Sequence, residues 1–162
     1  MEITIHKFEA SDIEDATRIW NQIVEEGNAF PQKETMEELE GIEFFQSQSY
    51  TGIAVNEKGE TVGLYILHPN NVGRCGHICN ASYAVEKNAR GQHVGEALVL
   101  DCMAKAKEIG FSILQFNAVV ATNIAALSLY EKLGFSKLGV IPKGFLMKDG
   151  TYEDIIPHII EL

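Results

Sequence analysis

Residues 83–98 read YAVEKNARGQHVGEAL, and this stretch decides which fold the chain is expected to adopt. Residues 83–85 end an apolar run typical of a strand, and an amphipathic helix is predicted from Gly95 onward. The N–H groups of a helix's first turn have no partner within the helix, and the helix dipole adds positive potential there. Gly91 and Gly95 let the backbone approach a ligand closely. The stretch therefore predicts either a pyrophosphate site or an ordinary turn between a strand and a helix.

The remaining sequence predicts an α/β sandwich around a mixed sheet. Helical spacing of apolar residues predicts two helices that begin at capping boxes, one at 11–14 and one at 35–38, and two more over 95–109 and 124–133. Gly134 is expected to end the last helix in a Schellman motif. Runs typical of strands lie at residues 1–8, 50–56, 61–68, 77–85, 113–120, 135–141 and 152–160. No linker or repeat interrupts the order, so a single domain over residues 1–162 is predicted.

Composition excludes several classes of partner. The chain has 162 residues, 46% of them hydrophobic, and a formal net charge of −10 without a dense Lys/Arg cluster, which argues against nucleic-acid binding. No apolar stretch is long enough to span a membrane, and the N-terminus lacks the layout of a signal peptide, so a cytoplasmic protein is expected. Cys75, Cys79 and Cys102 have neither zinc spacing nor an even count, so neither a metal nor a disulfide is predicted.

Two motifs decide between the alternatives for the opening stretch. Its glycine spacing matches neither the dinucleotide fingerprint nor a P-loop. Residues 90–95, RGQHVG, resemble motif A of the GNAT superfamily of N-acetyltransferases, Gln/Arg-x-x-Gly-x-Gly/Ala, although His93 stands where the family usually has its first glycine. Residues 123–135, NIAALSLYEKLGF, resemble motif B. The resemblance covers nearly the whole chain. It implies the GNAT fold, with a mostly antiparallel sheet of about seven strands flanked by four helices, and acetyl-CoA as cosubstrate.

The resemblance also implies which residues meet the coenzyme and how its sulfur leaves. Asn123 would contact the coenzyme arm, and Tyr130 would be the general acid for the departing thiolate. From the residues alone, either Thr122 or Asn123 could be a plain helix N-cap, and Tyr130 could be a core aromatic. The residues assigned to the coenzyme are Tyr83, Ala84, Val85, Arg90, Gly91, Gln92, His93, Val94, Gly95, Glu96, Asn123 and Tyr130.

A narrower resemblance concerns the acceptor. Residues 26–32, 77–81 and 114–120 are similar to fungal N-acetyltransferases that detoxify proline analogues such as azetidine-2-carboxylate. The similarity implies that Glu26, Phe30, Asn80 and Asn117 bind a small amino acid or related amine. Each asparagine has an alternative role, which is to satisfy a backbone group where two strands splay apart.

The general base is the least determined element of the mechanism. Glu26 is the first candidate and His77 a weaker one, and the amine could also arrive neutral. The predicted reaction is direct attack of a small-molecule amine on acetyl-CoA in a ternary complex. Acetylation of protein N-termini or lysines, and a non-catalytic acyl-CoA-binding module, stay open as alternatives, as does a homodimer.

Overall fold

The computed structural model describes residues 1–162 as four α-helices and eight strands. The helices are α1 (Ile13–Glu26), α2 (Glu38–Ser47), α3 (Val94–Ile109) and α4 (Ile124–Lys132). The strands are β1 (Thr4–Lys7), β2 (Tyr50–Val55), β3 (Thr61–Pro69), β4 (Ile78–Val85), β5 (Ile113–Val120), β6 (Ser136–Lys137), β7 (Ile141–Leu146) and β8 (Tyr152–Glu161). None of the helices combines the length and the apolar character needed to cross a bilayer.

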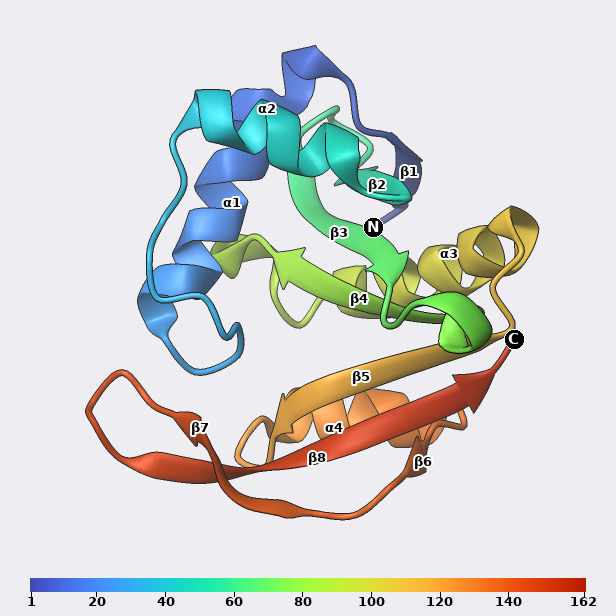
Figure 1. The fold of residues 1–162 in the computed structure, drawn as a ribbon. Helices are drawn as coiled ribbons and strands as arrows, with labels where there is room; N and C mark the ends of the chain where they lie inside the picture. The colour runs from blue at the N-terminus through green and yellow to red at the C-terminus, as the bar shows by residue number, and fades with distance from the viewer.

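The strands form one mixed sheet in the order β1-β2-β3-β4-β5-β8-β6, with β7 also paired to β8. Every pair is antiparallel except β4 and β5, which α3 connects and which run parallel. Figure 1 shows β4 and β5 diverging toward the side on which α1 ends. The predicted fold class is confirmed, with one strand more than the sequence indicates.

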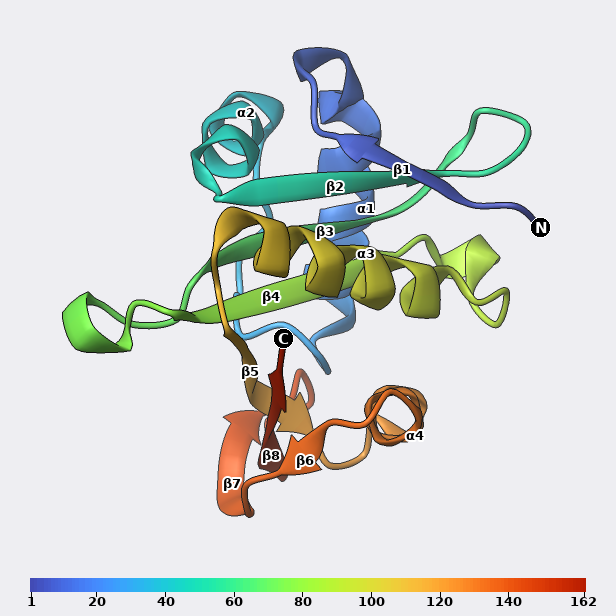
Figure 2. The same cartoon turned by 90° about the vertical axis from the view of Figure 1, so that its right-hand side faces the viewer.

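The two faces of the sheet carry separate hydrophobic cores because side chains alternate along each strand. On β3, Leu64 packs with Trp20 of α1, whereas Tyr65 packs with Leu98 of α3. Figure 2 shows α3 crossing the half of the sheet that contains β3 and β4, while α4 lies beside β5 and β8. Each half of the sheet is therefore covered by its own helix: α3 covers the half that ends with β4, and α4 covers the half that begins with β5.

Both predicted capping boxes are wrong. A short 3-10 turn precedes α1, and the capping box in this region is formed by Glu9 and Asp12 instead of residues 11–14. Helix α2 has Glu37 as its N-cap and no side-chain cap hydrogen bond, so the box at 35–38 is also absent. The four-residue spacing of a capping box does not encode the path of the chain before the helix. The spacing alone therefore misplaces the first residue of both α1 and α2.

The C-terminal strands also differ from the prediction. The strand expected at 135–141 is reduced to the two residues of β6, because Gly139 takes a φ of 135° that interrupts the extended backbone. The sequence does not predict β7, since Pro142 and Gly144 within six residues are typical of a loop. It forms as an edge strand on β8 with an irregular register, and the Lys143 N–H donates to Asp154 Oδ1 at 2.9 Å.

Candidate active site

The site lies where β4 and β5 stop pairing. Their parallel register ends with Cys79 opposite Leu114, and beyond it the strands separate. At the next position a side chain replaces the missing backbone bond: Asn80 Nδ2 donates to the Gln115 carbonyl at 2.8 Å. The separation of β4 and β5 therefore opens a gap in the sheet, and the Asn80 side chain bridges the two strands where the gap begins.

Two cavities occupy this gap and share part of their walls. The smaller one, about 190 Å³, is lined by Asn80 of β4, Asn117 of β5 and Phe30 of the loop after α1. The larger one, about 660 Å³, lies between α4 and the start of α3. The residues that line both cavities are Ala29, Tyr83, Asn123, Ala126 and Tyr130. Two molecules bound in the two cavities would therefore meet beside Tyr130.

The larger cavity ends at the loop that joins β4 to α3. The chain makes a 3-10 turn at Lys87–Ala89, and Gly91 and His93 then take positive φ of 77° and 63° before α3 begins. The N–H groups of the first turn of α3 have no helical partner. A Cβ at Gly95 would meet nothing nearer than 3.8 Å, so the wall is open at this residue. N–H donors and a helix dipole beside an open wall fit an anionic pyrophosphate group.

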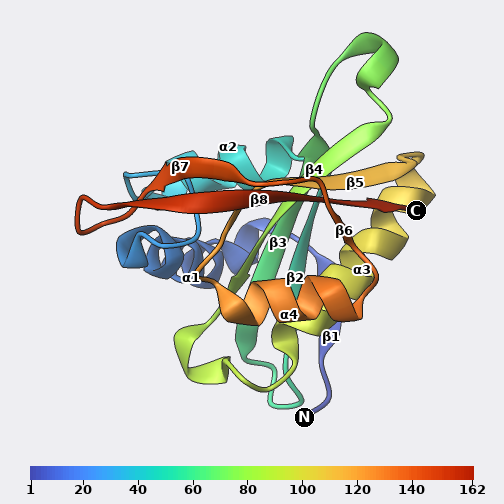
Figure 3. The same cartoon turned by 90° about the horizontal axis from the view of Figure 1, so that it is seen from below.

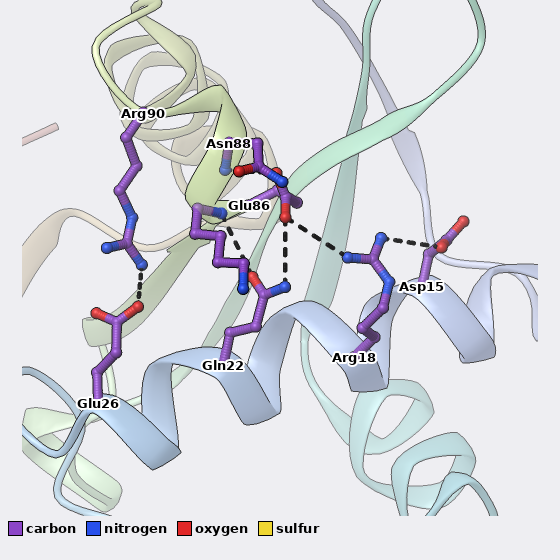
Figure 4. Close-up of polar contacts among 8 residues, drawn as sticks. Asp15, Arg18, Gln22, Glu26, Glu86, Asn88 and Arg90 are labelled. Carbon is purple, nitrogen blue, oxygen red and sulfur yellow. Dashed lines mark hydrogen bonds and ion pairs between the residues drawn. The ribbon is translucent and has the colours of Figure 1, made fainter.

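Side chains of α1 hold this loop in place (Figure 4). Arg90 donates to Glu26 Oε1 at 2.5 Å. Gln22 donates to the Glu86 carboxylate and accepts from the Lys87 N–H, both at 3.3 Å. Glu26 consequently lines the larger cavity beside the loop and not the smaller cavity, and one of its carboxylate oxygens already accepts a hydrogen bond from Arg90.

Tyr130 is packed on several sides and faces both cavities. Its ring centroid lies 4.6 Å from that of Phe116, 5.3 Å from Phe135 and 5.5 Å from His158. Burial raises the pKa of the Tyr130 phenol, so the hydroxyl stays protonated at neutral pH. A protonated phenol at the junction of the cavities can donate a hydrogen bond or a proton to a group bound there.

Both ends of α4 form as the sequence predicts, and they place Tyr130. Asn123 is the N-cap, and its Oδ1 accepts from the Ala126 N–H at 3.2 Å. At the other end Gly134 takes a φ of 92°, and the Phe135 N–H donates to the Tyr130 carbonyl at 2.9 Å, which is the Schellman pattern. The register of the helix between these ends turns Tyr130 toward the gap.

Comparison with known proteins identifies the family. The family model described as acetyltransferase (GNAT) family matches residues 15–135. The chain belongs to the GNAT acetyltransferase family. N-acetyltransferase aca1 of Schizosaccharomyces pombe is 36% identical over 88 residues, which are 54% of this chain and 42% of that protein. Protein SPT10 of Saccharomyces cerevisiae is 26% identical over 89 residues, 55% of this chain and 14% of that protein. The match thus spans less than half the length of these curated relatives.

Solved structures agree with the GNAT assignment. A GNAT enzyme from Kribbella flavida is 29% identical, with a TM-score of 0.91 over 99% of this chain and 98% of that one. A phosphinothricin acetyltransferase from Sinorhizobium meliloti, solved in complex with AcCoA, is 20% identical, with a TM-score of 0.91 over all of this chain and 89% of that one. Because the identity to the Sinorhizobium meliloti enzyme is only 20%, this similarity shows that the two chains share a fold and nothing about the substrate.

Most of the GNAT motif residues assigned to the coenzyme lie together, and two do not. Those that line the larger cavity are Tyr83, Val85, Arg90, Gly91, His93, Val94, Gly95, Glu96, Asn123 and Tyr130. Ala84 is fully buried in the core beneath α1, and Gln92 is exposed, so the side chains of these two line neither cavity. His77, the weaker base candidate, is exposed just before β4 and also lies outside both cavities.

Sequence reasoning misses several lining residues. Ala126 carries a signal, because it precedes Tyr130 by one helical turn and so faces the same way. Met147 has no such signal in the sequence, because it comes from the distant β7–β8 hairpin. This hairpin reaches the end of α1 (Figure 3), and there the Lys148 N–H donates to the Gly27 carbonyl at 3.1 Å. The other missed residues are Ile23, Asn28, Ala29, Pro31, Ala81, Ser82, Phe116, Ala118, Val119, Val120, Ala89, Val99, Thr122, Ile124, Ala125 and Leu129.

The ring of a buried histidine, His158, packs against the ring of Tyr130. His158 of β8 is 1% exposed, its Nδ1 donates to the Ile156 carbonyl at 2.6 Å, and its Nε2 has no partner. Burial lowers the pKa of the His158 imidazole, so the folded protein keeps this ring neutral.

Stability should therefore fall on mild acidification. The unfolded chain takes up the proton near the ordinary histidine pKa of about 6.5. The folded state resists protonation, so the stabilisation is complete above that pH and is lost as the pH falls through the lowered pKa. His158→Asn keeps a donor for the Ile156 carbonyl and does not titrate. Denaturant unfolding at about pH 7.5 and about pH 5.5 should show a smaller loss of stability in the variant than in the parent. Equal losses would contradict this assignment.

Proposed function

We propose that this GNAT family member transfers an acetyl group from acetyl-CoA to the amine of a small molecule. The proposal is carried by the two cavities that meet beside Tyr130. The smaller cavity, about 190 Å³, is below the roughly 300–1,000 Å³ of pockets for drug-sized ligands. Its lining contains amides and hydroxyls but no charged side chain. This chamber favours a small acceptor over a peptide.

The proposed chemistry is direct attack in a ternary complex. The amine nitrogen forms a bond to the acetyl carbon, the carbon–sulfur bond breaks, and the thiolate receives a proton from Tyr130. The proton that the nitrogen loses on becoming an amide returns the Tyr130 phenolate to the phenol. The Glu86 N–H donates to Val62 of β3, so by the alternation of a strand the Val85 N–H faces the open edge of β4. A donor at this edge is placed to stabilise the oxyanion of the tetrahedral intermediate.

Glu26 is the proposed proton acceptor, acting through water. Two carboxylates line the larger cavity and none lines the smaller one. Both oxygens of the other carboxylate, Glu96, accept from Lys132 at 3.0 Å, and this interaction lowers the pKa of Glu96. Arg90, in contrast, donates to only one oxygen of Glu26. Glu26 lies at the end of α1, next to the loop whose Ala29 and Phe30 line the smaller cavity.

Glu26→Gln should lower kcat/KM for the amine about tenfold at neutral pH, because the bound ammonium loses its proton acceptor. The deficit should shrink as the pH approaches the pKa of the free amine. The pH profile of kcat/KM for parent and variant measures this. Identical profiles would mean that the amine arrives neutral and that Glu26 only positions Arg90.

A thiol-release assay over a panel of amines tests the proposed function. The panel contains azetidine-2-carboxylate, proline, other small amino acids, aliphatic amines, and peptides with a free N-terminus or lysine. Turnover confined to small amines supports the proposal. Turnover confined to peptides indicates a protein acetyltransferase, and acetyl-CoA binding without turnover indicates a binding module. A homodimer stays a prediction.

The two asparagines test the acceptor chamber. Asn80→Ala and Asn117→Ala should each lower kcat/KM for the best amine about tenfold, the equivalent of ~1.4 kcal/mol of lost binding. The KM for acetyl-CoA should stay within twofold. If the variants instead lose thermal stability while the folded molecules keep the parent's turnover, the asparagines only close the splay between β4 and β5.

A further inference from the structure

The Asn117 carboxamide is held by hydrogen bonds at both of its ends. Its Oδ1 accepts from Gln115 Nε2 at 3.1 Å, and its Nδ2 donates to Asn70 Oδ1 at 2.6 Å. Gln115 and Asn117 are two residues apart on β5, so their side chains share one face of the strand. Asn70 comes from the turn after β3, 47 positions away in the sequence. The three amides therefore form a chain, and its central member, Asn117, lines the smaller cavity.

This amide chain has a direction. Gln115 donates to Asn117, and Asn117 donates to Asn70, so each carboxamide presents its NH₂ to the next one's oxygen. A half-turn of the central amide would place oxygen against oxygen at one end and NH₂ against NH₂ at the other, and both hydrogen bonds would be lost. With Gln115 and Asn70 in the orientations of this structure, their side chains hold the Asn117 carboxamide in one of its two orientations.

The backbone groups of the two end residues are hydrogen-bonded as well. The Asn70 N–H donates to the Ile78 carbonyl at 2.8 Å, which ties the turn after β3 to the start of β4. The Gln115 carbonyl accepts from Asn80 Nδ2 at 2.8 Å. Gln115 is consequently bonded to both acceptor-site asparagines, to Asn117 through its side chain and to Asn80 through its carbonyl.

We propose that Asn70 and Gln115 are positioning residues that orient the Asn117 carboxamide for the acceptor amine. The inference rests on the proposed function, because it requires that Asn117 bind the acceptor. A carboxamide has two N–H donors and two acceptor lone pairs. After the bonds to Asn70 and Gln115, one N–H and one lone pair of Asn117 remain for a ligand. Fixing their directions before binding lowers the entropy cost of binding the acceptor.

The test is a set of steady-state measurements with azetidine-2-carboxylate, or with the panel amine that is turned over fastest. Asn70→Ala should raise the KM for the amine about three- to tenfold, with kcat and the KM for acetyl-CoA within twofold. Gln115→Ala should act in the same direction, since it frees the other end of Asn117. Asn70→Asp keeps an oxygen that accepts from Asn117 Nδ2, and it should restore most of the parent KM.

Asn71→Ala is the matched control. Asn71 is exposed in the same turn, and its Oδ1 accepts from the Val72 N–H at 2.7 Å without contacting the chain of amides. This variant should keep the parent KM. Melting temperatures of all variants separate a local effect from unfolding, and Gln115→Ala, which removes the other bond to Asn117, keeps the test valid if Asn70→Ala is unstable.

The double variant Asn70→Ala/Asn117→Ala decides how Asn70 acts. If Asn70 works through Asn117, the double variant is no worse than Asn117→Ala alone. Additive losses, or an Asn70→Ala variant indistinguishable from Asn71→Ala, would overturn the proposal. The two failures are distinguishable: if Asn117→Ala leaves the amine KM unchanged, the proposed acceptor site is wrong. If Asn117→Ala raises it while Asn70→Ala does not, only the positioning role is wrong.

Discussion

Tyr130→Phe is expected to lower kcat by ~10²-fold or more, because the departing thiolate loses its proton donor. Phenylalanine keeps the ring contacts with Phe116, Phe135 and His158, so the change removes the hydroxyl alone. Burial raises the pKa of this phenol, so the donor stays protonated through the neutral and mildly alkaline range. Between about pH 7 and about pH 9 the parent should show no loss of kcat from ionisation of Tyr130.

Steady-state and single-turnover rates of the folded variant measure the effect, since the second is insensitive to product release. The KM for acetyl-CoA should hardly change. Tyr50→Phe is the matched control, because Tyr50 is a partly buried tyrosine that lines neither cavity. A Tyr130→Phe rate within about twofold of the parent, with a small drop in melting temperature, would make Tyr130 a core aromatic without a chemical role.

Gly95→Val should raise the KM for acetyl-CoA ~30-fold or more, equivalent to at least ~2 kcal/mol of lost binding. Gly95 lies in the first turn of α3 on the wall of the larger cavity. A Cβ there fits, since the nearest atoms, on Leu129 and Val85, are 3.8 and 3.9 Å away. The rest of the valine side chain would fill the space proposed for the pyrophosphate. The fold should persist, because valine has a higher helix propensity than glycine.

His93→Gly in the same loop is the control for Gly95→Val. His93 takes a φ of 63°, and its side chain is 83% exposed, so glycine relieves backbone strain without removing a buried contact. This variant should keep or improve acetyl-CoA affinity. Equilibrium binding of acetyl-CoA and thermal melts of both variants provide the comparison. Unchanged affinity in Gly95→Val would argue against the proposed cradle.

Several features of the fold and site were predictable because their determinants lie within a few residues of one another. The Asn123 N-cap and the Schellman end at Gly134 are set inside one short segment, and both form as predicted. All residues from Arg90 to Gly95 except Gln92 line the larger cavity, and the strand end, turn and helix start that place them lie within one short segment.

Other features depend on contacts between distant segments. Glu26 and Arg90 are 64 positions apart, and they form an ion pair beside the larger cavity, whereas Glu26 does not line the smaller one. Strand β7 contains Pro142 and Gly144, and it becomes a strand only because β8 pairs with it. For Asn80 the two alternatives are compatible: its side chain bonds the Gln115 carbonyl at the splay, and it also lines the smaller cavity.

The sequence by itself determined the GNAT family, the order of most elements, the ends of α4 and the loop proposed for the coenzyme. The family follows from the resemblance of two motifs, and the other features arise from periodicity and from hydrogen bonds between near neighbours in the chain. Only the tertiary structure decided the sizes of the two cavities, the partner of Glu26 and the amides that hold Asn117. These depend on where β4 and β5 stop pairing and on which loops pack across the gap, and no spacing along the chain encodes such contacts.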